Sequence, residues 1–181
     1  MTTQKTKQIV LVTGGSRGIG AAISLELASP DFVVIVNYNH SKSHADLIVE
    51  AIVKKGGEAI AVQANIAEEN ECKKMFEEIE KSVGSIDVLI NNAGITRDKS
   101  FRKMELSEWN EVINTNLSSA FNTCKLALPS MIENKYGRII NISSVIGQSG
   151  GFGQTNYAAA KSGLIGFSKS LAIETAKYGI T

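Results

Sequence analysis

Short runs of apolar residues alternate along the chain with longer stretches in which apolar residues recur at helical spacing. The apolar runs predict strands over residues 9–12, 33–36, 59–62, 88–90 and 138–142. The longer stretches predict helices over residues 20–28, 43–55, 68–82, 107–134 and 156–177. Unbroken apolar runs are typical of strands buried on both faces. The pattern therefore predicts an α/β fold, a doubly wound parallel sheet of the Rossmann-like type.

Ligands of such sheets bind beyond the carboxyl ends of the strands, where the strand order reverses. Residues that directly follow a strand are therefore the first candidates for a site. Neither a linker nor an internal repeat interrupts the pattern, so we expect residues 1–181 to form a single domain. The last residues, 178–181, are typical of a turn and the start of another strand. We expect the natural domain to continue beyond them.

Composition excludes several classes of protein. The chain has 181 residues, of which 43% are apolar and 20% charged, with only 2 prolines, as in ordinary globular proteins. A formal charge of +1 provides no general attraction to nucleic acid or to an anionic membrane, and no apolar run approaches the roughly 20 residues of a membrane span. Cys72 and Cys124 fall in helical patterns, where we expect buried thiols in a reducing compartment. We expect a cytoplasmic protein.

A glycine-rich segment, residues 13–20, follows the first predicted strand. Gly14, Gly18 and Gly20 would let the backbone approach a diphosphate at the amino end of the following helix. Their spacing, G-x-x-x-G-x-G, differs from the usual dinucleotide fingerprint, and Ala21 stands where a triphosphate-binding loop requires lysine. A turn without any ligand is the alternative interpretation.

The second predicted strand ends in residues 37–40, Asn-Tyr-Asn-His, where an NAD site would ordinarily carry an acidic residue. No acid is present, and the Arg17 guanidinium in the glycine segment could pair with a 2′-phosphate. These features favour NADP(H) over NAD(H), unless Arg17 is only a surface charge. His40 and His44 have a spacing that could hold a metal, but a third ligand is missing and we predict no metal site.

Candidate catalytic residues follow the later strands. Tyr157 and Lys161 lie one helical turn apart, on one helix face, where an ammonium favours the phenolate form of a phenol. Such a phenol can exchange protons near neutral pH, and Ser144 could bond the same substrate oxygen. Asn116 is a poor helix former within a predicted helix, so it either makes a specific hydrogen bond or is tolerated on the surface.

Together these motifs resemble the short-chain dehydrogenase/reductase family, in the family's order and over nearly the whole chain. The segments that carry the resemblance are the glycine segment, residues 91–94 (Asn-Asn-Ala-Gly) and the positions of a catalytic tetrad, Asn116, Ser144, Tyr157 and Lys161. The resemblance implies that NADP(H) binds to Gly14, Ser16, Arg17, Gly18, Ile19, Gly20, Asn39, Asn65, Ile66, Asn92, Ala93, Gly94, Tyr157 and Lys161. Asn65 stands where many members carry an aspartate beside the adenine.

Within the family, residues 94–104 are similar to bacterial reductases of 3-oxoacyl thioesters, carried by coenzyme A or by acyl-carrier protein. Residues 141–157 look more like the acetoacetyl-CoA reductases. The resemblance implies an acyl thioester substrate, bound near Asp98, Gln148, Phe152 and Gln154, and a homotetramer for the full-length protein. It also implies further strands beyond residue 181. A reductase of another carbonyl and a non-catalytic NADPH-binding protein are the alternatives.

Overall fold

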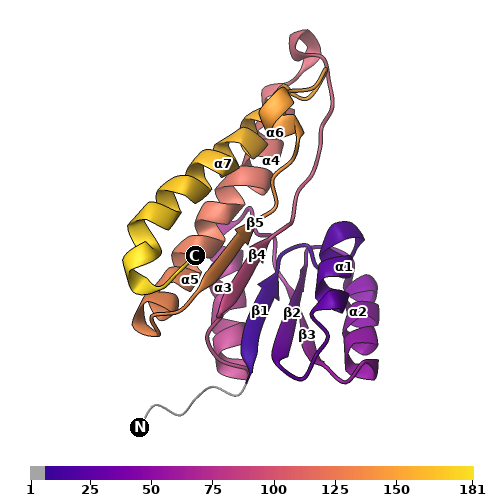
Figure 1. The fold of residues 1–181 in the computed structure, drawn as a ribbon. Helices are drawn as coiled ribbons and strands as arrows, with labels where there is room; N and C mark the ends of the chain where they lie inside the picture. The colour runs from indigo at the N-terminus through magenta and orange to yellow at the C-terminus, as the bar shows by residue number, and fades with distance from the viewer. Residues whose placement is uncertain (1–6) are drawn as a thin grey trace.

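In the computed structural model, which describes residues 7–181, parallel strands form one sheet in the order β3-β2-β1-β4-β5 (Figure 1). The strands are β1 (Gln8–Val12), β2 (Phe32–Tyr38), β3 (Glu58–Gln63), β4 (Val88–Asn91) and β5 (Arg138–Asn141). From β1 the chain adds β2 and then β3 on one side. It then crosses to the other side of β1, where β4 and β5 follow. The strand order therefore reverses between β1 and β4, and the predicted fold class is confirmed.

Helices cover both faces of the sheet, as the unbroken apolar strands require. On β1, Val10 and Val12 point to the face covered by α1 (Gly18–Glu26) and α2 (Lys42–Lys54). Ile9 and Leu11 point to the opposite face, because side chains alternate along a strand. That second face is covered by α3 (Glu69–Ser82), α5 (Ser119–Glu133) and α7 (Thr155–Thr175).

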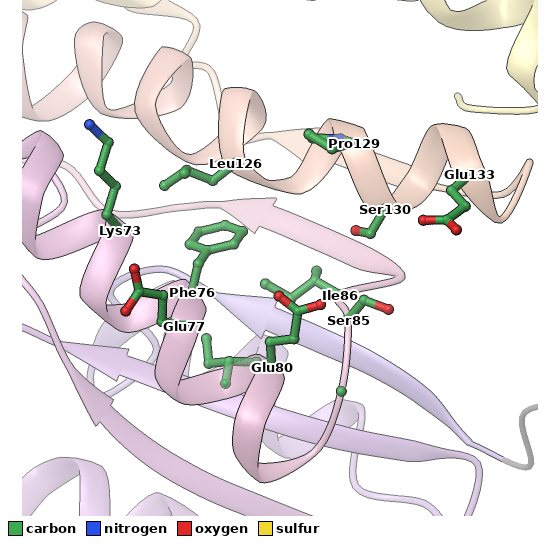
Figure 2. A pocket seen from close by; sticks show the side chains of 12 residues that line it. Lys73, Phe76, Glu77, Glu80, Ser85, Ile86, Leu126, Pro129, Ser130 and Glu133 are labelled. Carbon is green, nitrogen blue, oxygen red and sulfur yellow. The ribbon is translucent and has the colours of Figure 1, made fainter.

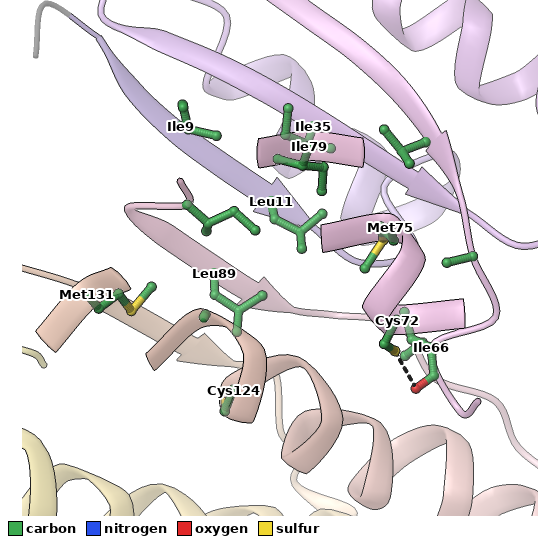
Figure 3. Close-up of a cluster of buried hydrophobic side chains, with 14 of the residues drawn as sticks. Ile9, Leu11, Ile35, Ile66, Cys72, Met75, Ile79, Leu89, Cys124 and Met131 are labelled. Atoms are coloured by element: carbon green, nitrogen blue, oxygen red, sulfur yellow. Dashed lines mark hydrogen bonds between the residues drawn. The ribbon is translucent and has the colours of Figure 1, made fainter. Parts of the chain in front are cut away.

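Cys72 and Cys124 lie in the second of these cores, among residues such as Met75, Ile79 and Leu89 (Figure 3). Burial raises the pKa of the Cys72 thiol to about 11 and that of Cys124 to about 12. The prediction that both cysteines are buried is therefore confirmed.

The single helix predicted over residues 107–134 is wrong in one respect. The structure has α4 (Leu106–Ile113), then a π-helical turn over Asn114–Ser118, and then α5. A π-turn inserts an extra residue into a helix without breaking the apolar pattern on either side, so periodicity does not reveal it. Shorter elements complete the fold, namely α6 (Ile146–Ser149) and 3-10 turns over Phe101–Lys103 and Ala176–Tyr178.

The last residues begin to pair with the sheet. Gly179 adopts a left-handed conformation with φ of 72°, and Ile180 then forms a parallel bridge with Gly137, beside the start of β5. The Ile139 N–H donates to the Thr181 carbonyl at 2.9 Å. The expected turn and strand start are thus observed. Across residues 7–181, no helix is both long and apolar enough to span a membrane.

Candidate active site

The glycine segment forms a tight turn at the carboxyl end of β1. Gly14 has a φ of 62°, in the left-handed region that favours glycine. A Cβ on Gly20 would lie only 2.2 Å from the Gly14 carbonyl oxygen, so the start of α1 packs directly on the turn. Asn92, just after β4, donates from Nδ2 to the Thr13 carbonyl at 2.9 Å. The ends of β1 and β4 are therefore joined at the point where strand order reverses.

Helix α1 begins at Gly18, two residues before the predicted start, and its amino end carries no side-chain cap. The first-turn N–H groups of a helix have no acceptor within the helix, and they attract anions. Ser16 is half-buried beside this end, whereas Arg17 and Ile19 are exposed. The segment thus offers backbone donors and one exposed guanidinium to an anionic ligand.

The ends of β2 and β3 bring further predicted cofactor residues to the same edge of the sheet. The buried Asn37 accepts the Gly14 N–H at 3.1 Å, which holds the glycine turn against β2. Asn39 is exposed just beyond β2. After β3, Asn65 accepts the Ala67 N–H at 3.1 Å, and the next residue, Ile66, is buried.

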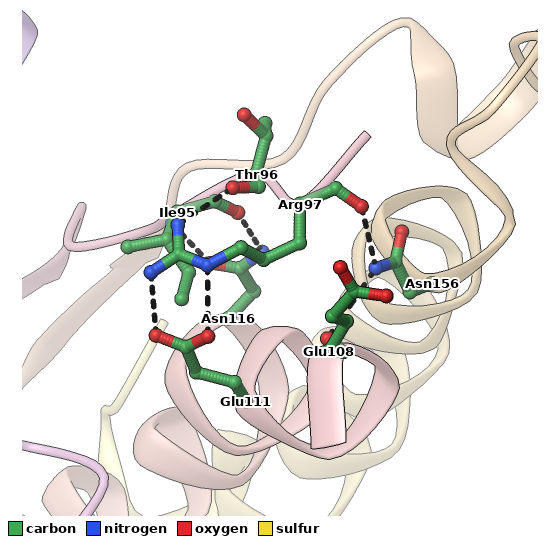
Figure 4. Close-up of polar contacts among 7 residues, drawn as sticks. All are labelled: Ile95, Thr96, Arg97, Glu108, Glu111, Asn116 and Asn156. Atoms are coloured by element: carbon green, nitrogen blue, oxygen red, sulfur yellow. Dashed lines mark hydrogen bonds and ion pairs between the residues drawn. The ribbon is translucent and has the colours of Figure 1, made fainter. Parts of the chain in front are cut away.

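Asn116 lies in the π-turn and is only 3% exposed, so the interpretation of a tolerated surface residue is wrong. Its Oδ1 accepts the Ile95 N–H at 2.7 Å, and its Nδ2 donates to the Ile95 carbonyl at 2.8 Å (Figure 4). A Cβ on Gly94 would lie 2.9 Å from Asn116 Oδ1 and 3.7 Å from Lys161 Nζ. Gly94 therefore brings the residues after β4 close to both side chains.

Lys161 is buried in α7, and burial lowers the pKa of its ammonium. Its Nζ donates to the Ile142 carbonyl at 2.6 Å, and lies 5.8 Å from the centre of the Tyr157 ring. Ser144, two residues beyond Ile142, accepts the Ile146 N–H on its Oγ at 3.2 Å. The adjacent Ser143 donates to the Lys161 carbonyl at 2.9 Å, which attaches the end of β5 to α7.

The predicted substrate residues lie on two segments that contact each other. Gln154 donates to Asp98 at 3.0 Å, joining the residues before α7 to those after β4. Phe152 is 96% exposed, and Gln148 is exposed on α6. An exposed aromatic side chain beside a polar pair can contact an acyl chain.

Sequence reasoning missed a chain of polar contacts that joins the carboxyl ends of β4 and β5 to two helices. Thr123 on α5 donates to Asn91 at 2.7 Å, and Asn91 donates to Asn141 at 2.8 Å. Asn141 in turn donates to Ser168 on α7, also at 2.8 Å. The available indication was that both apolar strands end in an asparagine. Asn156, which directly precedes Tyr157 and is completely buried, was missed as well.

A groove of about 340 Å³ lies between α3 and α5 and contains none of the predicted site residues (Figure 2). Its floor is apolar, with Phe76 and Leu126, and Glu77, Glu80 and Glu133 lie around it. Within residues 7–181 there is no group of three or more histidine, cysteine, aspartate or glutamate side chains that could hold a metal ion. The chemistry-bearing side chains gather instead at the carboxyl edge of the sheet.

Comparison with known proteins agrees with this geometry. Residues 8–181 match the short chain dehydrogenase family. A 3-oxoacyl-[acyl-carrier-protein] reductase from Staphylococcus aureus is 49% identical over 177 residues, which cover 98% of this chain and 72% of the relative. One from Synechocystis is 49% identical over 179 residues, covering 99% of this chain and 72% of that protein. An acetoacetyl-CoA reductase from Cupriavidus necator is 46% identical over 176 residues, covering 97% and 72%.

Proposed function

The chain belongs to the short chain dehydrogenase family, and on that premise we propose that it reduces a 3-oxoacyl thioester to the 3-hydroxyacyl thioester with NADPH. The chain is an oxidoreductase that acts on CH–OH groups with a nicotinamide cofactor, because it belongs to this family and its relatives are reductases. The choice of NADPH and of a 3-oxoacyl thioester is the proposal.

The observation that carries the proposal is that Asn116 and Lys161 meet at Gly94, with the Tyr157 ring beside the Lys161 amine. Lys161 Nζ lies 5.8 Å from the Tyr157 ring centre. A Cβ on Gly94 would lie within 4 Å of both Asn116 Oδ1 and Lys161 Nζ. Ser144 follows the neighbouring strand. Carbonyl reduction needs a proton donor, which a phenol beside an ammonium can be, and a hydrogen-bond donor to the carbonyl oxygen, which a serine hydroxyl can be.

The glycine segment fits a dinucleotide diphosphate. The turn at Gly14 and the uncapped start of α1 leave backbone donors available, and Gly18 has no atom within 4 Å of the place of its missing side chain. Arg17 is exposed beside these donors, and residues 37–40 carry no acid that would repel a 2′-phosphate. This combination supports NADPH over NADH.

A bound nicotinamide would supply the hydride for the keto carbon. Tyr157 would transfer its hydroxyl proton to the keto oxygen as charge develops there, and Ser144 would donate a hydrogen bond to the same oxygen. The Lys161 ammonium would stabilise the phenolate that remains. Asn116 already bonds Ile95 with both polar atoms, and its second amide hydrogen would hold a water that returns a proton through Lys161.

Residues 141–157, which resemble acetoacetyl-CoA reductases, lead us to propose acetoacetyl-CoA as the preferred substrate. A thioester of acyl-carrier protein is the second candidate, because the Staphylococcus and Synechocystis relatives are named for it. Sequence identities of 49% and 46% differ too little to decide between the two carriers. We also propose a homotetramer for the full-length protein, which light scattering of that protein would test.

The deciding experiment follows the loss of NADPH absorbance with acetoacetyl-CoA and, separately, with acetoacetyl-acyl-carrier protein. We expect turnover with both, faster with acetoacetyl-CoA, and slower turnover when NADH replaces NADPH. Tyr157→Phe should abolish turnover and leave the dissociation constant for NADPH largely unchanged, because the ring is kept and only the proton donor is lost. NADPH binding without any hydride transfer in the parent chain would favour the non-catalytic alternative.

A further inference from the structure

Asn156 lies at the second position of α7, directly before Tyr157, and its side chain is completely buried. The Nδ2 group donates to the Arg97 carbonyl at 3.1 Å and to the Glu108 carbonyl at 3.4 Å, and Oδ1 accepts the Tyr157 N–H at 2.8 Å. Figure 4 shows the amide reaching toward the segment after β4 and toward α4. One side chain thus joins three parts of the fold.

The bond to Tyr157 matters because of where it lies in the helix. First-turn N–H groups have no acceptor within a helix, and the N-cap residue of α7, Gln154, makes no side-chain cap. Asn156 supplies an acceptor to the Tyr157 N–H from its own side chain. The backbone of Tyr157 is therefore tied, through one amide, to the carbonyls of Arg97 and Glu108.

The segment that Asn156 holds is itself fixed at several points. Asn116 bonds both backbone groups of Ile95, and Arg97 forms a two-pronged ion pair with Glu111, with N···O distances of 2.8 and 2.6 Å. Lys99 Nζ lies 2.9 Å from Glu108. Residues 95–99 are thus a fixed reference to which Asn116 and Asn156 are both attached.

We propose that Asn156 is a positioning residue, which sets the Tyr157 hydroxyl relative to Asn116 and the substrate carbonyl. This inference rests on the proposed function. The amide contributes no proton of its own to the reaction, but it fixes the first turn of α7 against the segment that Asn116 also holds. Small displacements of a reacting group cost large factors in rate, so the effect should fall on turnover rather than on cofactor binding.

Two substitutions test this. Asn156→Ala removes all three bonds, and Asn156→Asp keeps the size and the acceptor for the Tyr157 N–H but places a carboxylate against two carbonyls. We expect each to lower kcat about 10–100-fold and to leave the NADPH dissociation constant within about twofold. A crystal structure of either variant should show the distance from Lys161 Nζ to the Tyr157 ring changed from 5.8 Å.

Ile79→Val is the matched control for loss of stability, since Ile79 is fully buried in α3 and outside the site. It should lower the unfolding temperature without changing kcat below that temperature. An Asn156 variant that loses stability as the control does, and keeps kcat, would overturn the proposal, as would failure of both Asn156 variants to fold. If the parent chain reduces no thioester, the proposed function fails, and the Tyr157 ring position in the variant structure decides the positioning role alone.

Discussion

Asn116 and Ile95 bond each other twice, through the Asn116 amide and both backbone groups of Ile95, at 2.7 and 2.8 Å. The side-chain amide thus satisfies the two backbone groups of Ile95, as the backbone of a neighbouring strand would do in a sheet. The bonds arise from the π-turn, because the turn carries Asn116 inward, where it is almost completely buried. A local departure from α-helical geometry thus fixes the segment after β4.

Replacing Asn116 by alanine should destabilise the fold and remove turnover together. The substitution leaves the N–H and carbonyl of Ile95 without their partners in a partly buried place, which costs about 1–3 kcal/mol of unfolding free energy. Urea unfolding followed by circular dichroism measures the change. Turnover should fall because Gly94 and the residues after it lose their support beside Lys161.

Asn110→Ala is the control for that substitution, because Asn110 is exposed on α4, one turn before the π-turn. Its free energy of unfolding should stay within about 0.5 kcal/mol of the parent. Equal stability of the parent and Asn116→Ala would show that water replaces the two bonds to Ile95.

Gly20→Ala should disrupt the cofactor turn. The new Cβ would lie 2.2 Å from the Gly14 carbonyl oxygen and 2.5 Å from Asn92 Nδ2, and the first of these contacts is with backbone that cannot rotate away. We expect a loss of about 1–3 kcal/mol in stability, typical of overpacking, and weaker NADPH binding in a fluorescence titration.

The same substitution at Gly166 in α7 provides the comparison, because no atom lies within 4 Å of its missing Cβ. Gly166→Ala should stabilise the chain by up to about 1 kcal/mol, since alanine favours helix over glycine. Unchanged NADPH affinity in Gly20→Ala would mean that the cofactor does not use this turn.

The strands could be predicted because each is a short apolar run bounded by polar residues, and burial on both faces leaves little else for such a run to do. The sheet edge that carries the site could also be predicted, because ligands of such sheets bind beyond the carboxyl ends of the strands. The π-turn could not be predicted, because the apolar pattern is helical on both sides of Asn114–Ser118. Helix α1 begins two residues earlier than the pattern predicts, because Gly18 and Gly20 carry no side chains that would show periodicity there.

Asn156 illustrates why the rest of the site was hidden. An asparagine in the first turn of a helix is common and is ordinarily solvated, so nothing in the sequence marks it as buried. Its partners are the carbonyls of Arg97 and Glu108, and backbone acceptors leave no trace in residue identity. Such contacts depend on how distant segments are placed in space.

Both thiols should be unreactive in the folded chain. Burial raises the pKa of Cys72 to about 11 and that of Cys124 to about 12, so little of the reactive thiolate exists at mildly alkaline pH. A disulfide reagent such as dithionitrobenzoate should label neither thiol in buffer and both in guanidinium chloride. Rapid labelling of one thiol in buffer would show that its helix opens, and Cys72→Ser would identify which one.

Lys161 should make stability depend on pH in a way that its removal abolishes. Burial lowers the pKa of its ammonium below the ordinary value of 10.5, so between the folded-state pKa and 10.5 the unfolded chain binds the extra proton. The contribution of this group to stability is therefore unfavourable at lower pH, and that cost is relieved as pH rises through the window.

The free energy of unfolding of the parent, minus that of Lys161→Met, should accordingly increase with pH below 10.5. Denaturant unfolding of both chains at several alkaline pH values measures it, and the subtraction cancels every other group that titrates there. A difference that stays flat would mean that the Ile142 carbonyl, which accepts from Nζ at 2.6 Å, compensates the burial of the charge.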